Sequence, residues 1–117
     1  MRIGELAART GVSRRSLRYY EEQGLLRADR TANDWRSYPE AAVDRARRIA
    51  GLLDSGLTIE GVRRLAPCLD EPDPPDCPDP GRALKTYQAR LAVLTDRLAA
   101  LQRDRDKVTA AIQTLPR

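Results

Sequence analysis

The chain has 117 residues, about the length of one domain, and its composition excludes several classes of protein. It contains no Phe and only four Tyr and one Trp, so a core must be built mainly from Leu, Ile, Val and Ala, which favours helices. No apolar run approaches the roughly 20 residues of a membrane span, and the first residues do not resemble a signal peptide. We therefore expect a cytoplasmic protein that does not bind membranes.

The residue types needed for catalysis and for most metal sites are missing. The sequence has no histidine, no glycine-rich phosphate loop and no Ser or Cys beside a plausible base. Without histidine, a mixed Cys/His zinc site within one chain is excluded, and no cysteine cluster for an iron–sulfur centre exists. We predict that the protein is not an enzyme and needs no cofactor or metal.

The net charge of +4 is unevenly distributed along the chain. Residues 1–65 carry 13 basic and 9 acidic residues, residues 66–80 carry five acidic residues and no basic one, and residues 81–117 carry 8 basic and 3 acidic residues. Six prolines fall in the acidic stretch, so neither a helix nor a strand interior is expected there. This pattern divides the chain into a folded unit over 1–66, a linker over 67–81 and a terminal segment over 82–117.

Two short helices are predicted at the N-terminus. Apolar residues at helical spacing indicate a first helix over residues 3–10, which Gly11 ends. Ser13 is suited to cap a second helix that runs to about Gln23. Two helices joined by a three-residue turn form a helix-turn-helix, whose second helix usually enters the major groove of DNA.

A β-hairpin and two further helices are expected next. Residues 25–38 contain a polar turn between two short segments that suit strands, and a hairpin in this place is a wing. Pro39 suits the start of a third helix that runs to Ser55. Thr58 then caps a short fourth helix.

The second helix and the hairpin carry side chains that suit a DNA surface. Arginine reaches phosphates and guanine edges, and tyrosine hydroxyls add backbone contacts. The predicted partner is therefore double-stranded DNA, and the predicted contact residues are Ser13, Arg14, Arg15, Arg18, Tyr19, Tyr20, Arg30, Asn33, Trp35 and Arg36.

Several alternatives stay open at this surface. The helix arginines could instead form a solvated basic face, and Trp35 could be a structural aromatic that holds the hairpin to the core. Leu17 and Tyr20, three residues apart, are expected to point inward, which would make one of the two tyrosines structural. Glu21 and Glu22 would repel phosphate if they faced it, so DNA contacts are expected in the first two turns of the helix.

The last segment shows the clearest periodicity in the chain. Positions spaced alternately by three and four residues form a two-in-seven seam, typical of a coiled coil. Its members, apart from Arg105, are the predicted dimerisation residues Leu84, Tyr87, Leu91, Leu94, Leu98, Leu101, Val108, Ile112 and Leu115. A helix over 82–115 is roughly 50 Å long and needs a partner for its seam. We expect a homodimer; the alternative is an intramolecular hairpin with the third helix.

Five segments of the sequence resemble the MerR family of bacterial transcription regulators. They are Ile-Gly-Glu-Leu-Ala at 3–7, Thr-Gly-Val-Ser at 10–13, Leu-Arg-Tyr-Tyr-Glu-Glu-Gln-Gly-Leu-Leu at 17–26, Arg-Ser-Tyr at 36–38 and Gly-Leu-Thr-Ile-Glu-Gly-Val at 56–62. The resemblance implies a winged helix-turn-helix domain joined to an antiparallel coiled-coil dimer. It also implies a pseudo-palindromic promoter operator that the protein bends and untwists, with RNA polymerase as a further partner.

By position, the resemblance places four residues on the recognition helix, Arg14, Arg18, Tyr19 and Tyr20, and two on the wing, Arg30 and Arg36. The chain departs from the family at Asp34-Trp35, where the wing turn usually has Gly followed by Tyr or an equivalent. Asp34 would place an acid near the phosphates. In this family, metal and redox sensors also keep a cysteine at the start of the long helix and a cysteine loop after its end, and we do not expect that loop here.

Cys68 and Cys77 are therefore the remaining candidates for a response to an effector. A thiol switch, or a metal site shared with the second protomer, is one interpretation; two free thiols in a linker is the other, which we favour because neighbouring carboxylates raise the pKa of a thiol. The regulator has two rivals in function: a DNA-architectural protein that lacks a ligand response, and an adaptor that acts through the coiled coil.

Overall fold

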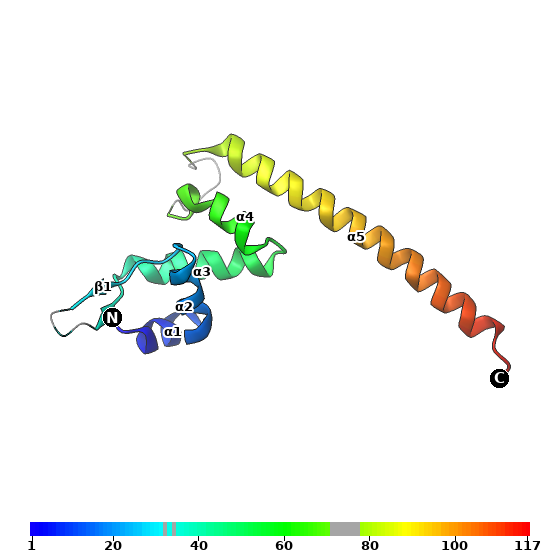
Figure 1. Cartoon of the computed structure of the whole chain (residues 1–117), viewed down its shortest axis with the longest axis horizontal. Coiled ribbons are helices and arrows are strands. Elements are labelled where there is room, and N and C mark those ends of the chain that lie inside the picture. Colours follow the sequence, from blue (N-terminus) through cyan, green and yellow to red (C-terminus); the bar gives the residue numbers. More distant parts are fainter. Residues whose placement is uncertain (32, 34, 71–77) are drawn as a thin grey trace.

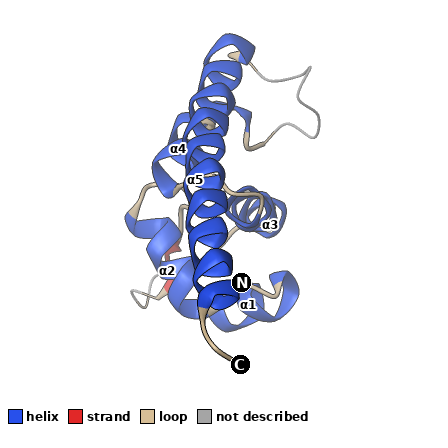
Figure 2. Cartoon of the chain, turned by 90° about the vertical axis from the view of Figure 1, so that its right-hand side faces the viewer, coloured by secondary structure: helices blue, strands red, loops and turns tan. Residues whose placement is uncertain are grey.

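The computed structural model describes residues 1–31, 33, 35–70 and 78–117, and it is elongated, with extents of 71 × 37 × 20 Å. Figure 1 shows a helical N-terminal unit from which one long helix, α5, projects to the C-terminus. In Figure 2, which is turned by 90°, α5 lies in front of the other helices. The strands form only a small part of the fold. The predicted fold class, mainly α with a winged helix-turn-helix and a long terminal helix, is confirmed.

The helix-turn-helix consists of α1 (Ile3–Thr10) and α2 (Arg14–Glu22). Gly11 follows α1 with φ of 74°, the left-handed conformation that glycine adopts without strain. The hydroxyl of Ser13 accepts a hydrogen bond from the backbone N–H of Ser16 at 3.0 Å, so Ser13 is the N-cap of α2. Both predicted helices and both predicted end signals are confirmed.

The wing is a two-stranded antiparallel sheet of β1 (Asp29–Arg30) and β2 (Arg36–Ser37). Asp29 pairs with Ser37, and Arg30 pairs with Arg36. Each strand is only two residues long, which is shorter than the predicted hairpin over 25–38, because Leu25 and Leu26 are buried in the core instead. The expectation about Asp34 lies outside the described residues.

Helix α3 (Ala41–Asp54) and helix α4 (Ile59–Arg64) complete the N-terminal unit. The carbonyl of Pro39 accepts a hydrogen bond from Ala42, so Pro39 lies in the turn before α3 rather than at its first position. The hydroxyl of Thr58 accepts a hydrogen bond from Gly61 at 3.1 Å and caps α4 as predicted. The expectation that residues 66–80 hold no helix was wrong at its start, since Ala66–Cys68 form a 3₁₀ helix, η1. Pro67 is compatible with it because the first turn needs no backbone donor.

One apolar core joins these elements. Its fully buried side chains include Leu6 of α1, Leu17 of α2, Tyr38 after the wing and Ile49 of α3. Leu69 is also buried in this core, so the packing of the N-terminal unit continues past residue 66.

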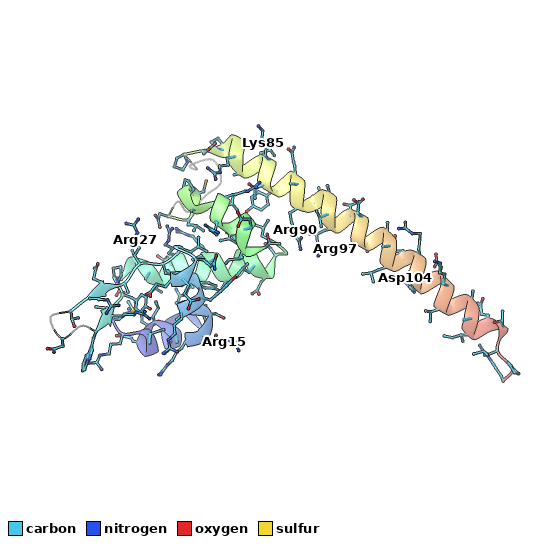
Figure 3. All side chains as sticks on the ribbon, viewed as in Figure 1. Arg15, Arg27, Lys85, Arg90, Arg97 and Asp104 are labelled. Carbon is cyan, nitrogen blue, oxygen red and sulfur yellow. The ribbon has the colours of Figure 1, made fainter. Side chains whose placement is uncertain are left out.

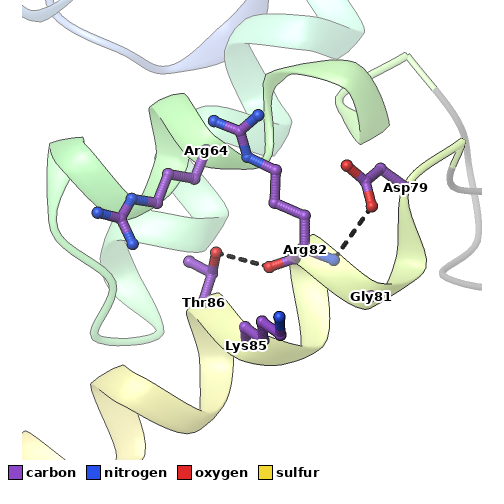
Figure 4. Close-up of a pocket in the computed structure, with 6 residues that line it drawn as sticks. All are labelled: Arg64, Asp79, Gly81, Arg82, Lys85 and Thr86. Atoms are coloured by element: carbon purple, nitrogen blue, oxygen red, sulfur yellow. Dashed lines mark hydrogen bonds between the residues drawn. The ribbon is translucent and has the colours of Figure 1, made fainter.

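Helix α5 (Pro80–Thr114) begins beside α4 and then leaves the N-terminal unit. Asp79 caps it by accepting a hydrogen bond from the N–H of Arg82 at 3.1 Å. Figure 4 shows the hollow between the two helices, lined by Arg64, Asp79, Gly81, Arg82, Lys85 and Thr86. Further along, Arg90 donates from Nε to the carbonyl of Gly56 at 2.5 Å. The alternative of a hairpin with α3 is not adopted, since α5 packs against α4. Among the described residues, no helix is long and apolar enough to cross a lipid bilayer.

Candidate nucleic-acid interface

Helix α2 separates its side chains into a buried face and an exposed face. Leu17 and Tyr20 are buried in the core, as their spacing predicted. Arg14, Arg15 and Arg18 are exposed, and Tyr19 is 37% exposed. The prediction that Tyr20 contacts DNA was therefore wrong: burial against the core gives Tyr20 a structural role, and it raises the pKa of its phenol. The exposed face of α2 keeps the other predicted contacts.

Two residues at the start of α2 also serve the local fold. Ser13 uses its hydroxyl to cap the helix and to donate to Ser16 Oγ at 3.0 Å. The guanidinium of Arg14 lies over Gly4 of α1, where a Cβ atom would come within 2.8 Å of Nη2. Because glycine has no side chain, position 4 leaves room for this guanidinium beside α1.

The wing presents Trp35 to solvent rather than to the core. The indole is 52% exposed, so Trp35 is not part of the buried core, and its two interpretations, as a DNA contact and as a structural aromatic of the hairpin, both stay open. The guanidinium carbon of Arg2 lies 3.7 Å from the centroid of the Trp35 ring, a cation–π contact. Met1 and Tyr38 exchange two backbone hydrogen bonds, of 2.7 and 2.8 Å, which hold the chain before α1 beside the wing.

Arg2 is a candidate contact that the sequence analysis missed. Its only signal in the sequence is a basic residue directly before the first helix, and Trp35 is far away along the chain. In the structure, a surface hollow of about 380 Å³ brings it together with predicted residues; its lining consists of Arg2, Ile3, Arg18, Trp35, Arg36 and Tyr38. Three guanidinium groups from three different segments thus share one concave surface around an exposed indole.

Glu21 was expected to repel phosphate if it faced DNA, but its carboxylate is paired within the protein. One of its carboxylate oxygens lies 3.4 Å from Arg36 Nε, and the other accepts a hydrogen bond from the Tyr38 hydroxyl at 3.0 Å. Burial, and then this hydrogen bond, raise the pKa of Tyr38 to about 12. The carboxylate therefore does not simply repel phosphate; it orients a wing arginine and joins α2 to the wing.

Other arginines of the N-terminal unit bind within the protein. Arg9 forms a two-pronged ion pair with Glu40, which lowers the pKa of that carboxyl. Arg45 bonds the carbonyl of Leu25 at 2.5 Å and Asp70 at 2.9 Å. Arg47 and Arg48 donate to the carbonyls of Arg9 and Leu69, respectively. All three arginines of α3 thus bind within the protein, so part of the arginine excess is not available to a partner.

The remaining predicted wing residues are placed at the surface. Arg30 and Asn33 are exposed, and Arg30 belongs to β1. Figure 3 labels two further arginines of the N-terminal unit, Arg15 and Arg27, which lie on different sides of this unit. Positive charge is therefore not confined to one face, and the cluster of Arg2, Arg18 and Arg36 is distinguished by its shared hollow rather than by charge alone.

The seam of α5 is exposed along its whole length. The exposed apolar side chains include all nine predicted dimerisation residues, from 36% for Leu94 to 65% for Leu91 and Leu101. In a folded protein a row of large apolar residues of this length on one helix marks an interaction surface.

Cys68 lies at the end of η1 and is half-buried. Cys68 is disulfide-bonded in the structure. The favoured interpretation of a free thiol was therefore wrong for Cys68. Cys77 lies outside the described residues.

The architecture defines a class: a winged helix-turn-helix unit with a coiled-coil helix behind it. Residues 1–67 match the model of the MerR HTH family regulatory protein. The chain is 31% identical over 110 residues to the HTH-type transcriptional regulator ZntR of Escherichia coli (strain K12). The matched region covers 90% of this chain and 78% of ZntR. The chain belongs to the MerR family.

Other relatives match over shorter parts of their length. The chain is 37% identical to the mercuric resistance operon regulatory protein of Bacillus cereus, over 67% of this chain and 59% of that protein. It is 42% identical to the nodulation protein NolA of Bradyrhizobium sp. (strain NC92), over 54% of this chain and 27% of NolA. The chain thus spans less than two thirds of either relative.

A solved structure shares the fold over nearly the whole chain. It is the transcription regulator PbrR691 from Ralstonia metallidurans CH34 in complex with lead(II), with a TM-score of 0.81 and 23% sequence identity. The similarity covers 99% of this chain and 88% of that one, so the projecting α5 is part of the shared fold.

Proposed function

We propose that this chain is a dimeric, sequence-specific DNA-binding transcription regulator. The observation that carries the proposal is the hollow in which Arg2, Arg18 and Arg36 surround the exposed ring of Trp35. Its arginines come from the chain before α1, from α2 and from the wing. This suits a partner whose negative charges are spaced along a groove, as phosphates are in duplex DNA.

In this proposal α2 enters the major groove and the wing follows the neighbouring backbone. Arg14, Arg15, Arg18 and Tyr19 are the exposed residues of α2 available for base or phosphate contacts. On the wing, the exposed residues proposed to contact DNA are Arg30, Asn33, Trp35 and Arg36. The ion pair with Glu21 orients the side chain of Arg36 on the wing.

The exposed seam of α5 supports a homodimer. Two copies related by a two-fold axis present two α2 helices to a pseudo-palindromic site, which fits an operator within a promoter. Bending and untwisting such a site costs on the order of several kcal/mol, which the contacts of both protomers have to offset. RNA polymerase at the same promoter is the further partner of this proposal.

The test is binding of the full chain to a labelled duplex from its own upstream region, compared with a scrambled duplex of equal length. Arg18→Ala should weaken binding to the native duplex by more than about 1 kcal/mol, and the affinity should fall steeply with salt. Arg103→Ala, which removes the same charge from α5, is the matched control and should change little. Equal, salt-insensitive binding to both duplexes would refute a sequence-specific regulator, and long, continuous footprints would favour an architectural protein.

A response to thiol oxidation is a second candidate function, and the bonded state of Cys68 favours it. Affinity for the native duplex should then differ between reduced and oxidised protein. The Cys68→Ser variant should show one affinity under both conditions. Identical affinities for the native protein, reduced and oxidised, would leave the cysteines without a regulatory role.

A further inference from the structure

Helix α5 is attached to the N-terminal unit along its first turns. Ala83 packs against the apolar core, and Thr86 is buried, with only 6% of its surface exposed. Arg90 donates from Nε to the carbonyl of Gly56 at 2.5 Å, and Cδ1 of Leu94 lies 3.4 Å from where a Cβ on Gly56 would be. These residues of α5 follow one another at spacings of three or four, so they share one face of the helix. Further along, α5 projects away from the unit (Figure 1).

Thr86 is a narrow point of contact between α4 and α5. Its hydroxyl donates to the carbonyl of Arg82 in its own helix at 2.8 Å, and its methyl carbon lies 3.6 Å from where a Cβ on Gly61 of α4 would be. Two surface hollows, of about 540 and 260 Å³, both border Thr86. The first, drawn in Figure 4, extends from Thr86 back to Asp79, and the second extends onward to Val93. Because the two helices are not packed continuously, Thr86 is a point about which α5 could tilt.

Arg90 supplies a second point of attachment, which opposes such a tilt. Its acceptor, the carbonyl of Gly56, belongs to the turn between α3 and α4. Backbone hydrogen bonds from Gly56 to Leu53 at 3.1 Å and from Leu57 to Leu52 at 3.2 Å hold this turn, and Leu57 is buried in the core. Figure 3 shows Arg90 on the side of α5 that faces the N-terminal unit. Since the turn is fixed within that unit, the bond from Arg90 fixes the direction of α5.

The short distance between these two points makes the direction of α5 sensitive to them. Thr86 and Arg90 lie about 6 Å apart along the helix, whereas α5 continues for roughly 42 Å from Thr86 to Thr114. A shift of about 1 Å at Arg90, with Thr86 as the pivot, would tilt α5 by about 10° and move its far end by roughly 7 Å. This displacement equals about two base-pair steps of duplex DNA, at ~3.4 Å per step.

The attachment face lies directly beside the seam. Thr86 and Arg90 immediately precede Tyr87 and Leu91, which belong to the predicted dimerisation residues. The way in which α5 sits on its own N-terminal unit therefore also determines where a second copy of that unit lies. In a dimer that reads two half-sites, this geometry has to match their separation along the duplex and their rotation around it.

We propose that Thr86 and Arg90 are positioning residues that hold the two α2 helices of the dimer at one separation, and so select the spacing of the operator half-sites. Thr86 is the pivot, and the hydrogen bond from Arg90 to Gly56 is the latch that sets the angle. This inference rests on the proposed function, a dimeric DNA-binding regulator, and deepens it by naming what determines its choice of operator.

Substitutions at Arg90 separate the hydrogen bond from the charge. Arg90→Gln removes the charge but keeps an N–H donor one bond beyond Cδ, where Nε of arginine lies. Arg90→Met has a side chain of similar length and no donor. Gln and Met both favour helices, so both variants should fold. Arg97→Met, seven residues further along α5, removes the same charge from the projecting part of the helix and is the matched control (Figure 3).

The first measurement is the affinity of the full chain for operator duplexes whose half-sites are one base pair closer or farther apart than in the native duplex. The native protein, Arg90→Gln and Arg97→Met should bind the native spacing at least about tenfold more tightly than either altered spacing. For Arg90→Met this ratio should fall to about threefold or less. Affinity for a single half-site should agree within about twofold among all four proteins, because neither position belongs to α2 or the wing.

The second measurement is the distance between the two N-terminal units of the dimer without DNA. Ala41, exposed at the start of α3, is replaced by Cys and spin-labelled in a chain that also carries Cys68→Ser and Cys77→Ser. Pulsed electron paramagnetic resonance should give one narrow distance for the parent protein, Arg90→Gln and Arg97→Met. Arg90→Met should give a broad distribution, because α5 is then free to tilt about Thr86.

Both changes in Arg90→Met, absent from Arg90→Gln and Arg97→Met, support the proposal. An unchanged distance in Arg90→Met overturns the latch, and a broad distance with unchanged spacing selectivity overturns its role in choosing the operator. Equal losses in Arg90→Gln and Arg90→Met would mean that charge matters rather than the hydrogen bond, which also overturns the latch. A native protein that binds its own duplex without spacing selectivity overturns this inference alone. A native protein that is monomeric, or does not prefer its own duplex, refutes the proposed function and this inference with it.

Discussion

Glu21 shows how a single acid can serve a basic surface. Its two oxygens hold Arg36 and the Tyr38 hydroxyl, which lie at the end of the wing. The carboxylate neutralises part of the local charge in the free protein and restricts the wing arginine to one region of space. A negative residue on the proposed DNA-binding surface is thus compatible with binding, because its carboxylate is already paired.

Tyr38→Phe tests this arrangement without changing the packing of the ring. At neutral pH the variant should be less stable by about 1–2 kcal/mol, since Glu21 loses a buried donor. Because the folded pKa of Tyr38 is raised to about 12 from the ordinary 10, this contribution is complete below pH 10 and is lost as the pH rises towards 12. Urea denaturation of both proteins at pH 8 and pH 11 should show the difference shrinking. A constant difference would mean that the hydroxyl does not titrate as described.

Arg2→Ala tests the contact that only the three-dimensional structure revealed. Arg2 stacks on Trp35 and lines the same hollow as Arg18 and Arg36, so the variant should weaken binding to the native duplex by about 1 kcal/mol. Titration of the duplex with the variant and with Arg103→Ala gives the comparison at equal net charge. Equal affinities for these two variants would remove Arg2 from the interface.

At the scale of elements, the sequence predicted what local chemistry determines. Ser13, Thr58 and Gly11 act on the residues next to them, so caps and helix ends could be read directly from their positions. The seam of α5 was also readable, because its period is a property of one helix. The contacts of Glu21 with the wing, and of Arg2 with Trp35, could not be read, because they depend on how distant segments pack. Tyr20 was misassigned to the DNA surface because neighbouring tyrosines on a helix look alike until the core is known.

The cap of α2 gives a prediction at this scale. Ser13→Ala should lower the free energy of unfolding by about 1 kcal/mol, because the N–H of Ser16 loses its acceptor. Ser13→Asp, which keeps an acceptor at the N-cap, should retain most of the stability. Denaturation in urea without DNA measures the effect on the fold alone. If both variants are equally unstable, the hydroxyl contributes through something other than capping.

For the whole molecule, the decisive feature is the separation of the two surfaces. The hollow around Trp35 lies on the N-terminal unit, whereas most of the exposed seam lies on the projecting part of α5. A change at the centre of the seam should therefore leave the proposed DNA-contacting residues of one protomer in place, while it removes the second protomer that carries the same residues. The operator is then recognised by one protomer at a time.

Leu98→Lys is the change that tests this separation. It puts an ammonium group into the middle of an apolar seam, so the dimer should dissociate at least about 100 times more readily, as expected for a charge buried without a partner. Helix content and the stability of the N-terminal unit should stay close to those of the native protein, and affinity for a full operator should fall to that for a half-site. Ala110→Lys adds the same charge on the outer face of α5 and should preserve both the dimer and full-operator binding. Unchanged operator affinity for a monomeric Leu98→Lys protein would mean that one copy suffices, and that the seam serves another partner.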